Sequence, residues 1–299
     1  MALSESRKGE SLVGLSGFIW AFFPVITVLS YAWIPSLHSL AWSTLFATLT
    51  FAIVVSYRKR WGELRNPQLW KYGLLIAFFI GILFYGLYYV GLETTTPGNA
   101  AIIALFEVFT ASVFFHVFRG EKIPFPHMAG ALLMIVGAVI VLAQGFTDFH
   151  IGDLLILVAT FFTPMGNYFQ QRARAIASSD TIMFMRSLLS VPFLFLLAYT
   201  LHPNIGLTQV QSSLPILLFS GIILLGLSKI FWIEGIHRIS VPKALALQSV
   251  VPFLTLLIAW VILAQQPTIW QLTSLVPFVL GVLLLTDHLK LFRNNPKRV

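Results

Sequence analysis

The stretch GLETTTPGNAAIIALFEVFTASVFFHVF, residues 91–118, has a partner in GIHRISVPKALALQSVVPFLTLLIAWVI, residues 235–262. The two stretches align without gaps, and Pro97 of the first matches Pro242 of the second. Each is apolar and long enough to cross a membrane, because a helical span needs about 20 mostly apolar residues. The chain therefore repeats itself, and the fold depends on how two such copies sit in a membrane.

The composition is that of a protein whose main solvent is lipid. The 299 residues are 58% hydrophobic and only 10% charged, and the mean hydropathy is +0.86. Soluble domains carry about 25% charged residues, so this chain has too little charge to cover a water-facing surface. The absence of cysteine excludes a disulfide framework and a cysteine-based metal centre.

Ten apolar stretches are predicted to cross the membrane as helices, and the connections between them are short. They are residues 12–32, 36–56, 70–91, 97–118, 124–143, 152–171, 181–201, 214–235, 243–264 and 268–287. No small-x-small cleavage site follows the first stretch, which favours an uncleaved first helix. We therefore predict an all-α polytopic membrane protein with ten transmembrane helices.

The basic residues predict the orientation of these helices. Of the 19 Lys and Arg residues, all except Arg186 and Lys229 fall in termini and connections on one side of the ten-span arrangement. Cytoplasmic loops carry such an excess of basic residues. We therefore expect both termini in the cytoplasm and the protein in a bacterial-type inner (plasma) membrane. The formal net charge of +8 then reflects a membrane surface and not a nucleic-acid partner.

The ten spans divide into two halves of five. The first repeat would cover residues 1–146, and the second would cover residues 147–299 with a short basic cytoplasmic tail. An odd number of spans in each half makes the two copies face opposite ways across the membrane. Inverted repeats of this kind are typical of secondary transporters, whose substrate site lies near the midplane between the halves.

Several motifs carry a family resemblance. They are Trp20 and Pro24 in the first span, VFTASVFFHVFRGEKIPFPHMAGALLMIVGAVIVL at 108–142, VPFLTLLIAWVI at 251–262 and VLGVLLL at 279–285. On these residues the chain resembles the EamA-like branch of the drug/metabolite transporter superfamily, over nearly its whole length. The resemblance implies two inverted five-helix repeats, no cofactor, and the transport of amino acids, drugs or other metabolites.

Two positions of the first half depart from the family pattern. Pro35 should be followed seven residues later by arginine, but Trp42 stands there, whereas Arg186 is kept in the second half. Glu107 occupies the place where the pattern has proline, which the second half keeps as Pro252. These departures make the two halves chemically different.

Lys229 lies inside a predicted span, in GLSKIFWIEG at 226–235. A central charge costs about 2.5–3.5 kcal/mol on insertion scales, so it needs water or a partner. One hypothesis is that the stem snorkels toward the cytoplasm, as far as Glu234. Another is that Ser228, Lys229 and Trp232 share a face that binds the anionic group of a substrate. A helix–helix salt bridge is the third.

Arg186 and Glu107 are the other two candidates among the charged residues of the predicted spans. Arg186 could bond backbone carbonyls, or close a gate with Asp180 or with an acid of another helix. Glu107, at the centre of its span, could carry a coupling proton, or it could be a structural ion-pair partner of Lys229. A relay to His116 is a further possibility for Glu107, although the two lie too far apart along the helix for direct contact.

Aromatic residues make up 14% of the chain. Most are expected to face lipid or to pack between helices, but some are candidates for lining a substrate cavity. Together with Ser228 and Lys229, the predicted substrate-binding residues are Trp20, Tyr85, Tyr88, Tyr89, Tyr168 and Trp232. Tyr85 is the first-half counterpart of Lys229, so the two walls of the cavity would differ.

Pro24 and Pro164 occupy similar places in the first helix of each repeat. Each removes a backbone hydrogen bond and kinks its helix. We predict that these helices bend there during gating, with a static kink that serves packing as the alternative.

The chain shows no catalytic motif, no metal-binding pattern and no phosphate-cradling loop. The function hypothesis is therefore a secondary transporter, working as an exporter, of small organic metabolites such as amino acids or related zwitterions and anions. Its partners would be the substrate, membrane lipids and a coupling proton. The alternatives are an exchanger of organic phosphates or nucleotide sugars, and a membrane protein or enzyme that binds a metabolite or lipid without moving it.

Overall fold

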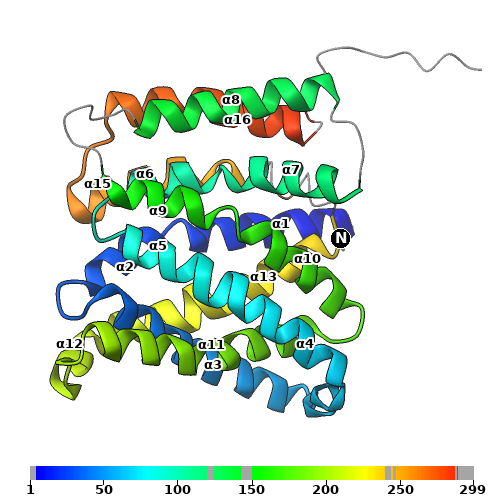
Figure 1. Ribbon diagram of the computed structural model, residues 1–299, viewed down its shortest axis with the longest axis vertical. Coiled ribbons are helices and arrows are strands. Elements are labelled where there is room, and N and C mark those ends of the chain that lie inside the picture. Colours follow the sequence, from blue (N-terminus) through cyan, green and yellow to red (C-terminus); the bar gives the residue numbers. More distant parts are fainter. Residues whose placement is uncertain are drawn as a thin grey trace, which may run out of the picture.

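The computed structural model describes residues 5–119, 124–142, 150–239, 244, 247–286 and 288. This part of the chain is all-helical and contains no strand. Pro242, the partner of Pro97 in the sequence repeat, lies outside the described residues. Figure 1 shows the helices running roughly along one common direction, as expected for a bundle that crosses a membrane.

Eight helical segments are long and apolar enough to span a membrane: Glu5–Ser30, Ser36–Tyr57, Pro67–Gly91, Pro97–Phe114, Phe125–Leu142, Ile151–Arg174, Ser179–Leu201 and Leu207–Ile236. Two shorter apolar helices, Val251–Leu263 and Ile269–Leu285, lie where the sequence predicts the ninth and tenth spans. The protein is thus a multi-pass membrane protein.

The individual helices follow the labels of Figure 1. Those of the first half are α1 (Glu5–Trp20), α2 (Phe23–Ser30), α3 (Ser36–Tyr57), η1 (Trp61–Arg65), α4 (Pro67–Ile76), η2 (Ala77–Phe84), α5 (Tyr85–Gly91), α6 (Pro97–Ala104), α7 (Glu107–Arg119) and α8 (Phe125–Leu142). Those of the second half are α9 (Ile151–Ala159), α10 (Thr163–Arg174), α11 (Ser179–Leu201), α12 (Leu207–Phe219), η4 (Ser220–Leu227), α13 (Ser228–Ile236), α15 (Val251–Leu263) and α16 (Ile269–Leu285).

The first span of each half is broken at its middle. Helix α1 ends at Trp20, and after two intervening residues α2 begins at Phe23, with Pro24 in its first turn. In the same way α9 ends at Ala159, and Pro164 stands in the first turn of α10. Proline is well tolerated there, because the first turn of a helix has no acceptor for its backbone N–H groups.

Two more spans are broken in the same manner. Helix α6 ends at Ala104 and α7 begins at Glu107, which replaces the proline of the family pattern. In the second half, α15 begins at Val251 with Pro252 in its first turn. Each break therefore places the N-terminus of a new helix inside the bundle.

Glycine allows the helices to approach closely, as is usual in membranes, where small residues let backbones come together. Helices α8 and α16 lie side by side along one edge of the bundle (Figure 1). A Cβ built on Gly281 of α16 would lie 2.8 Å from the carbonyl oxygen of Gly130 on α8. A Cβ built on Gly152 of α9 would collide with the carbonyl oxygen of Gly91 at the end of α5.

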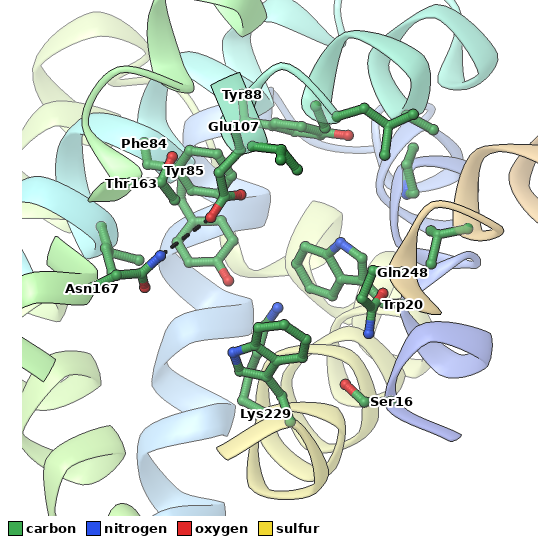
Figure 2. Close-up of a pocket in the computed structure, with 18 of the residues that line it drawn as sticks. Ser16, Trp20, Phe84, Tyr85, Tyr88, Glu107, Thr163, Asn167, Lys229 and Gln248 are labelled. Carbon is green, nitrogen blue, oxygen red and sulfur yellow. Dashed lines mark hydrogen bonds between the residues drawn. The ribbon is translucent and has the colours of Figure 1, made fainter. Parts of the chain in front are cut away.

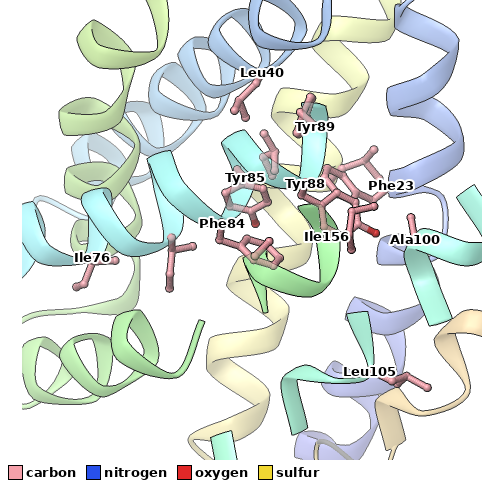
Figure 3. Packing of buried hydrophobic residues seen from close by; sticks show 14 of the residues in the cluster. Phe23, Leu40, Ile76, Phe84, Tyr85, Tyr88, Tyr89, Ala100, Leu105 and Ile156 are labelled. Atoms are coloured by element: carbon pink, nitrogen blue, oxygen red, sulfur yellow. The ribbon is translucent and has the colours of Figure 1, made fainter. Parts of the chain in front are cut away.

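Buried aromatic residues fill the centre of the bundle (Figure 3). The Phe23 ring lies 5.4 Å from that of Tyr88 and 5.6 Å from that of Tyr89, measured between centroids. These rings tie the start of α2 to α5, beside the break in the first span. The core thus packs directly against the interrupted helices.

Ion pairs join α3 to α11 at one end of the bundle. Arg58 and Arg60 contact the Asp180 carboxylate at 2.7 and 3.2 Å, and Asp180 itself is fully buried. Next to this pair, Glu63 accepts hydrogen bonds from the backbone amide and the hydroxyl of Ser178 at 2.8 and 2.9 Å. The connection after α3 is thereby fastened to the start of α11.

Gly152→Ala tests the close contact between α9 and α5. The added methyl group meets backbone and has no room to move, so we expect a loss of about 1–3 kcal/mol in unfolding free energy. Gly86→Ala on α5 is the matched control, because a Cβ there meets nothing within 4 Å. It should be neutral or gain up to about 1 kcal/mol from helix propensity. Thermal unfolding in detergent measures both, and equal effects would contradict the packing.

The hydrogen-bonded carboxylate of Glu63 should make the stability of the fold depend on pH. Partial burial alone would raise the pKa of Glu63, but the hydrogen bonds from Ser178 and Thr181, together with the charge of Arg60, outweigh it and hold the pKa below its usual 4.5. Glu63 therefore stabilises the fold above pH 4.5, and this contribution is lost as the pH falls through the folded-state pKa. The melting temperature of Glu63→Gln should lie below wild type at pH 7, and the two should converge in acid. A constant difference at all pH values would refute this.

Candidate functional site

A cavity of about 170 Å³ lies at the breaks in the four interrupted spans. Its walls include Pro24 at the start of α2, Glu107 at the start of α7, Thr163 at the start of α10 and Pro252 at the start of α15. Two of these helices belong to each half of the chain. The cavity is therefore shared between the halves, inside the apolar bundle.

Four helix N-termini thus meet at one cavity. The first N–H groups of a helix have no partner within it, and each N-terminus carries a partial positive charge of about half a unit. In transporters with interrupted helices, such termini face anionic groups of the substrate. Helices α1 and α6 also end beside this cavity, at Trp20 and Ala104, so the partial charges of N-termini and C-termini oppose one another, and the side chains decide which charge the cavity favours.

Glu107 is half-buried at the N-terminus of α7, where a carboxylate is well placed. Its Oε1 accepts a hydrogen bond of 3.2 Å from the side-chain amide of Asn167 on α10 (Figure 2). Glu107 and Asn167 both line the cavity and come from different halves of the chain. This bond joins the halves through Glu107, the one acidic residue among the described residues that line the cavity.

Lys229 points into the cavity from α13. Its Nζ lies 3.2 Å from the centroid of the Trp20 ring, which is a cation–π contact. The Trp20 ring in turn stacks on Phe23, with centroids 4.1 Å apart. Within the described residues, no carboxylate lies within ion-pair distance of Lys229. Glu234, the snorkelling partner considered above, pairs instead with Arg238 at 2.8 Å.

Arg186 on α11 also lines the cavity, although only 5% of its surface is exposed. Its guanidinium carbon lies 5.7 Å from the centroid of the Tyr85 ring. Asp180 does not pair with Arg186, because both arginines after α3 already hold that carboxylate. The arginine thus faces the cavity and the ring, and not the gate partner named from the sequence.

The structure brings together most of the residues predicted to bind substrate. Figure 2 shows Glu107 with Asn167 on one side of the cavity and Trp20 with Gln248 across from them. Around these polar groups stands an aromatic wall made of Trp20, Phe84, Tyr85, Tyr88 and Trp232. The cavity therefore combines two cations, one carboxylic acid and an aromatic surface.

Three predicted residues do not line the cavity. The Ser228 hydroxyl donates to the Leu224 carbonyl oxygen at 2.6 Å, one turn back along the span. Tyr89 is fully buried in the core. The Tyr168 ring faces the Arg172 guanidinium at 4.7 Å. Each lies beside a cavity residue in the sequence but points elsewhere.

Several polar cavity residues escaped the sequence analysis. They are Ser16, Thr163, Asn167, Gln170 and Gln248. For three of them a signal existed, since Asn167, Gln170 and Gln248 carry amide side chains inside predicted spans, where uncompensated amides are costly. The others are small or lie at a break that hydropathy does not reveal.

A polar network lies at the other end of the bundle from the Arg58–Asp180 pair. Thr95 donates to the Asp153 carboxylate, and the Asn99 amide lies 3.2 Å from the same carboxylate. Gln271 on α16 donates to the Asn99 side-chain oxygen at 2.8 Å. This network ties the connection before α6 to α9 and α16.

Among the described residues, no group of three or more His, Cys, Asp or Glu side chains is placed to hold a metal ion. His116 bonds the Ser112 carbonyl oxygen of its own helix at 2.7 Å, and among the described residues it makes no hydrogen bond to Glu107. The charges of the cavity are thus those of its side chains and helix termini.

Comparison with known proteins gives a consistent picture. The model of the EamA-like transporter family matches residues 7–143 and again residues 150–287. The chain is 22% identical to "Uncharacterized transporter YyaM" of Bacillus subtilis, over 96% of this chain and 95% of that protein. It is 21% identical to "Uncharacterized transporter YvbV" of the same organism, over 91% and 89%.

A solved structure shares the fold. A protein crystal structure superposes with a TM-score of 0.71 at 18% identity, covering 96% of this chain and 100% of the other. This similarity concerns the fold alone, since so low an identity does not carry function.

Asn167→Leu tests the bond that joins the halves. Removing a donor from a buried acid costs about 1–3 kcal/mol, so we expect a loss of that size in wild type. In a Glu107→Leu background the same change should cost less than about 0.5 kcal/mol, because no acid is left unpaired. Thermal unfolding of the four proteins measures the coupling. Equal costs in both backgrounds would show that the amide does not stabilise Glu107.

Proposed function

Because the chain belongs to the EamA-like transporter family, we propose that it is a secondary transporter of small organic metabolites. The cavity between the halves is its substrate site, and substrate passes by alternating access. Lys229 carries the most weight, because an ammonium without a carboxylate partner inside an apolar bundle needs an anionic ligand or water.

The proposed topology has ten helices in two inverted repeats, residues 1–146 and residues 147–299, with both termini in the cytoplasm of a cell with an inner (plasma) membrane. Two matches of one family model, 7–143 and 150–287, support this division. The repeated breaks before Pro24 and Pro164 support it as well.

The proposed substrate is an amino acid or a related zwitterion or anion. Lys229 binds its anionic group, and the rings of Trp20, Tyr85, Tyr88 and Trp232 contact its apolar part. A cavity of about 170 Å³ suits a molecule of this size. The proposed direction is export, which rests on the family resemblance alone.

Glu107 is proposed to carry the coupling proton. It lies in the substrate cavity, so its charge state and substrate occupancy would influence one another. Its bond to Asn167 links the halves, so a change in protonation would also change their contact. Pro24 and Pro164 mark the places where the broken spans would bend.

The two ends of the bundle supply candidate gates. Arg58 and Arg60 with Asp180 close one end, and Asp153 with Thr95 and its neighbours closes the other. Alternating access requires that one set opens while the other stays closed. In this scheme Arg186 is a cavity residue and does not take part in either gate.

One observation favours a second candidate within the transporter class. Lys229 and Arg186 both line the cavity, and two cations suit an organic phosphate or a nucleotide-sugar-type substrate. A protein that binds a metabolite or lipid without moving it remains the rival from another class. The names of the relatives, which are transporters, speak against this rival and against an enzyme.

Ligand-induced thermal stabilisation identifies the substrate class. A ligand at a hundred times its dissociation constant stabilises by about 2.7 kcal/mol. Among amino acids, polyamines, organic acids and organic phosphates, we expect a class that bears a carboxylate or phosphate, and not the polyamines, to raise the melting temperature of wild type. The shift should vanish in Lys229→Ala and persist in the matched control Lys71→Ala, an exposed lysine near the start of α4. A full shift in Lys229→Ala would remove this lysine from the site.

Passage across a sealed vesicle decides between transport and binding. Reconstituted wild type should accumulate or release the labelled ligand found above, and a pH gradient should change the rate. Binding without passage would favour the rival class. Passage that is indifferent to the pH gradient would remove the coupling role of Glu107.

A further inference from the structure

The connection between the second and third spans lies at the membrane surface. The second span is Ser36–Tyr57 and the third is Pro67–Gly91, so residues 58–66 lie beyond the apolar length of both. Residues 58–71 carry five basic side chains and a single acidic one, Glu63. Each of the other connections has at most two basic residues in the sequence. Positive charge is thus concentrated on one short segment at one end of the bundle.

Two of these five cations have a partner within the protein. Arg58 and Arg60 hold the Asp180 carboxylate of α11. The other three are exposed and make no hydrogen bond or ion pair to the described part of the chain: Lys59, Arg65 and Lys71. Like charges on one segment repel one another, so this segment favours an anionic partner from outside the chain.

The backbone of Lys59 is in an unfavourable conformation. Its φ is 53°, in the left-handed region. It lies in the turn that ends α3, where the Arg60 amide donates to the Val55 carbonyl oxygen at 3.0 Å. Such helix ends usually have glycine in the left-handed position, because a side chain is strained there. A lysine that is poorly suited to its backbone points to a use for its charge.

Aromatic residues accompany the three cations along the segment. Trp61 of η1 and Trp70 of α4 are 44% and 39% exposed, and Tyr57 is 87% exposed. The Trp61 indole N–H donates to the Ser56 hydroxyl at 3.1 Å, and that of Trp70 donates to the Leu64 carbonyl oxygen at 2.8 Å. Both indoles are therefore held in place. Tryptophan and tyrosine collect at the headgroup level of a bilayer, so these rings indicate the depth of the segment.

This depth selects the partner. An anionic phospholipid carries its phosphate at the headgroup level and is held there by its own acyl chains. Lysine and arginine next to a membrane surface are attracted to such headgroups. A free anion must come from bulk water, where salt screens the attraction of exposed charges. The lipid is therefore the favoured source of the negative charge.

We propose that Lys59, Arg65 and Lys71, accompanied by Trp61 and Trp70, bind the headgroups of anionic phospholipids. The lipids belong to the leaflet at this end of the bundle, which is the cytoplasmic leaflet in the proposed topology. Bound phosphate groups neutralise the three cations and steady the end of α3, whose arginines pair with α11. The surface lies outside the substrate cavity, and the inference does not rest on the proposed transport function.

Lipid titration of the purified full-length protein tests the site. The protein is kept in a neutral detergent, and its melting temperature is followed as phosphatidylglycerol or phosphatidylcholine with the same acyl chains is added. We expect a saturable rise with phosphatidylglycerol that exceeds the rise with phosphatidylcholine, and no rise with inorganic phosphate at equal ionic strength. Arg65→Gln should increase the phosphatidylglycerol fraction at half-maximal effect about fivefold, the share of one basic residue.

Arg65→Lys is the matched control, because it changes the same exposed side chain and keeps its charge. Its response to phosphatidylglycerol should equal that of wild type within about twofold, since attraction to the membrane surface depends on charge and not on guanidinium geometry. A loss as large as that of Arg65→Gln would show that charge is not what the site uses.

Lys59→Gly separates lipid binding from a role in folding. Glycine relieves the left-handed strain, so in phosphatidylcholine this variant should melt above wild type. Its half-maximal phosphatidylglycerol fraction should nevertheless rise about fivefold, because one cation is missing. A lysine that served the fold alone would give a variant with a lower melting temperature in both lipids.

Three results would overturn the proposal: equal rises with phosphatidylglycerol and phosphatidylcholine, an equal rise with inorganic phosphate, or an unchanged half-maximal fraction in both Arg65→Gln and Lys59→Gly. The readout needs neither substrate nor transport. Its failure would therefore leave the transport proposal standing, and failure of transport would leave the lipid site standing.

Discussion

The architecture depends on one constraint, which is that a helix interrupted inside a membrane leaves backbone groups unpaired. Lipid cannot satisfy them, so irregular backbone at this depth must face protein or a polar cavity. Here four spans are broken, and the starts of α2, α7, α10 and α15 all meet at the central cavity. The broken helices therefore face a polar cavity, and any preference of that cavity for negative charge comes from its side chains, Lys229 and Arg186.

The placement of charge in the bundle follows from the same constraint. Three of the four helices that begin at the cavity, α2, α10 and α15, have proline in their first turn. The fourth, α7, begins with Glu107. A carboxylate at a helix N-terminus is stabilised where it would otherwise be costly. The exchange of one proline for Glu107 thus gives a nearly symmetric scaffold one acidic wall, opposite the cationic residue Lys229. Because the two halves of the cavity carry opposite charges, a substrate with two different ends would bind in one orientation.

Much of the fold could be predicted from the sequence, because span length and hydropathy are local properties. The all-helical class is confirmed, and eight predicted spans correspond to helices long enough to cross a membrane. The ninth and tenth are present as shorter apolar helices. The breaks at Pro24 and Pro164 were also visible, since proline acts on its own helix.

Side-chain orientation and pairing could be predicted less well. Successive helical residues point about 100° apart, so Ser228 and Tyr89 turn away although Lys229 and Tyr88 line the cavity. The partner of Asp180 could not be inferred from α11 alone, because Arg58 and Arg60 reach it from the end of α3. The same holds for Asn167 and Glu107, which meet only because the two halves pack together. Contacts between distant segments are set by packing, which a single sequence does not display.

The central claim is that one cavity opens alternately to the two sides of the membrane. The chain contains no cysteine, so a single Ala104→Cys in the cavity wall can be labelled with a membrane-impermeant thiol reagent from either side of sealed vesicles. The account predicts labelling from both sides. It also predicts that Asp153→Asn, which weakens one gate, raises the rate from that side and lowers it from the other, because both rates report one equilibrium. Labelling from a single side in both proteins, or two rates that rise together, would contradict alternating access.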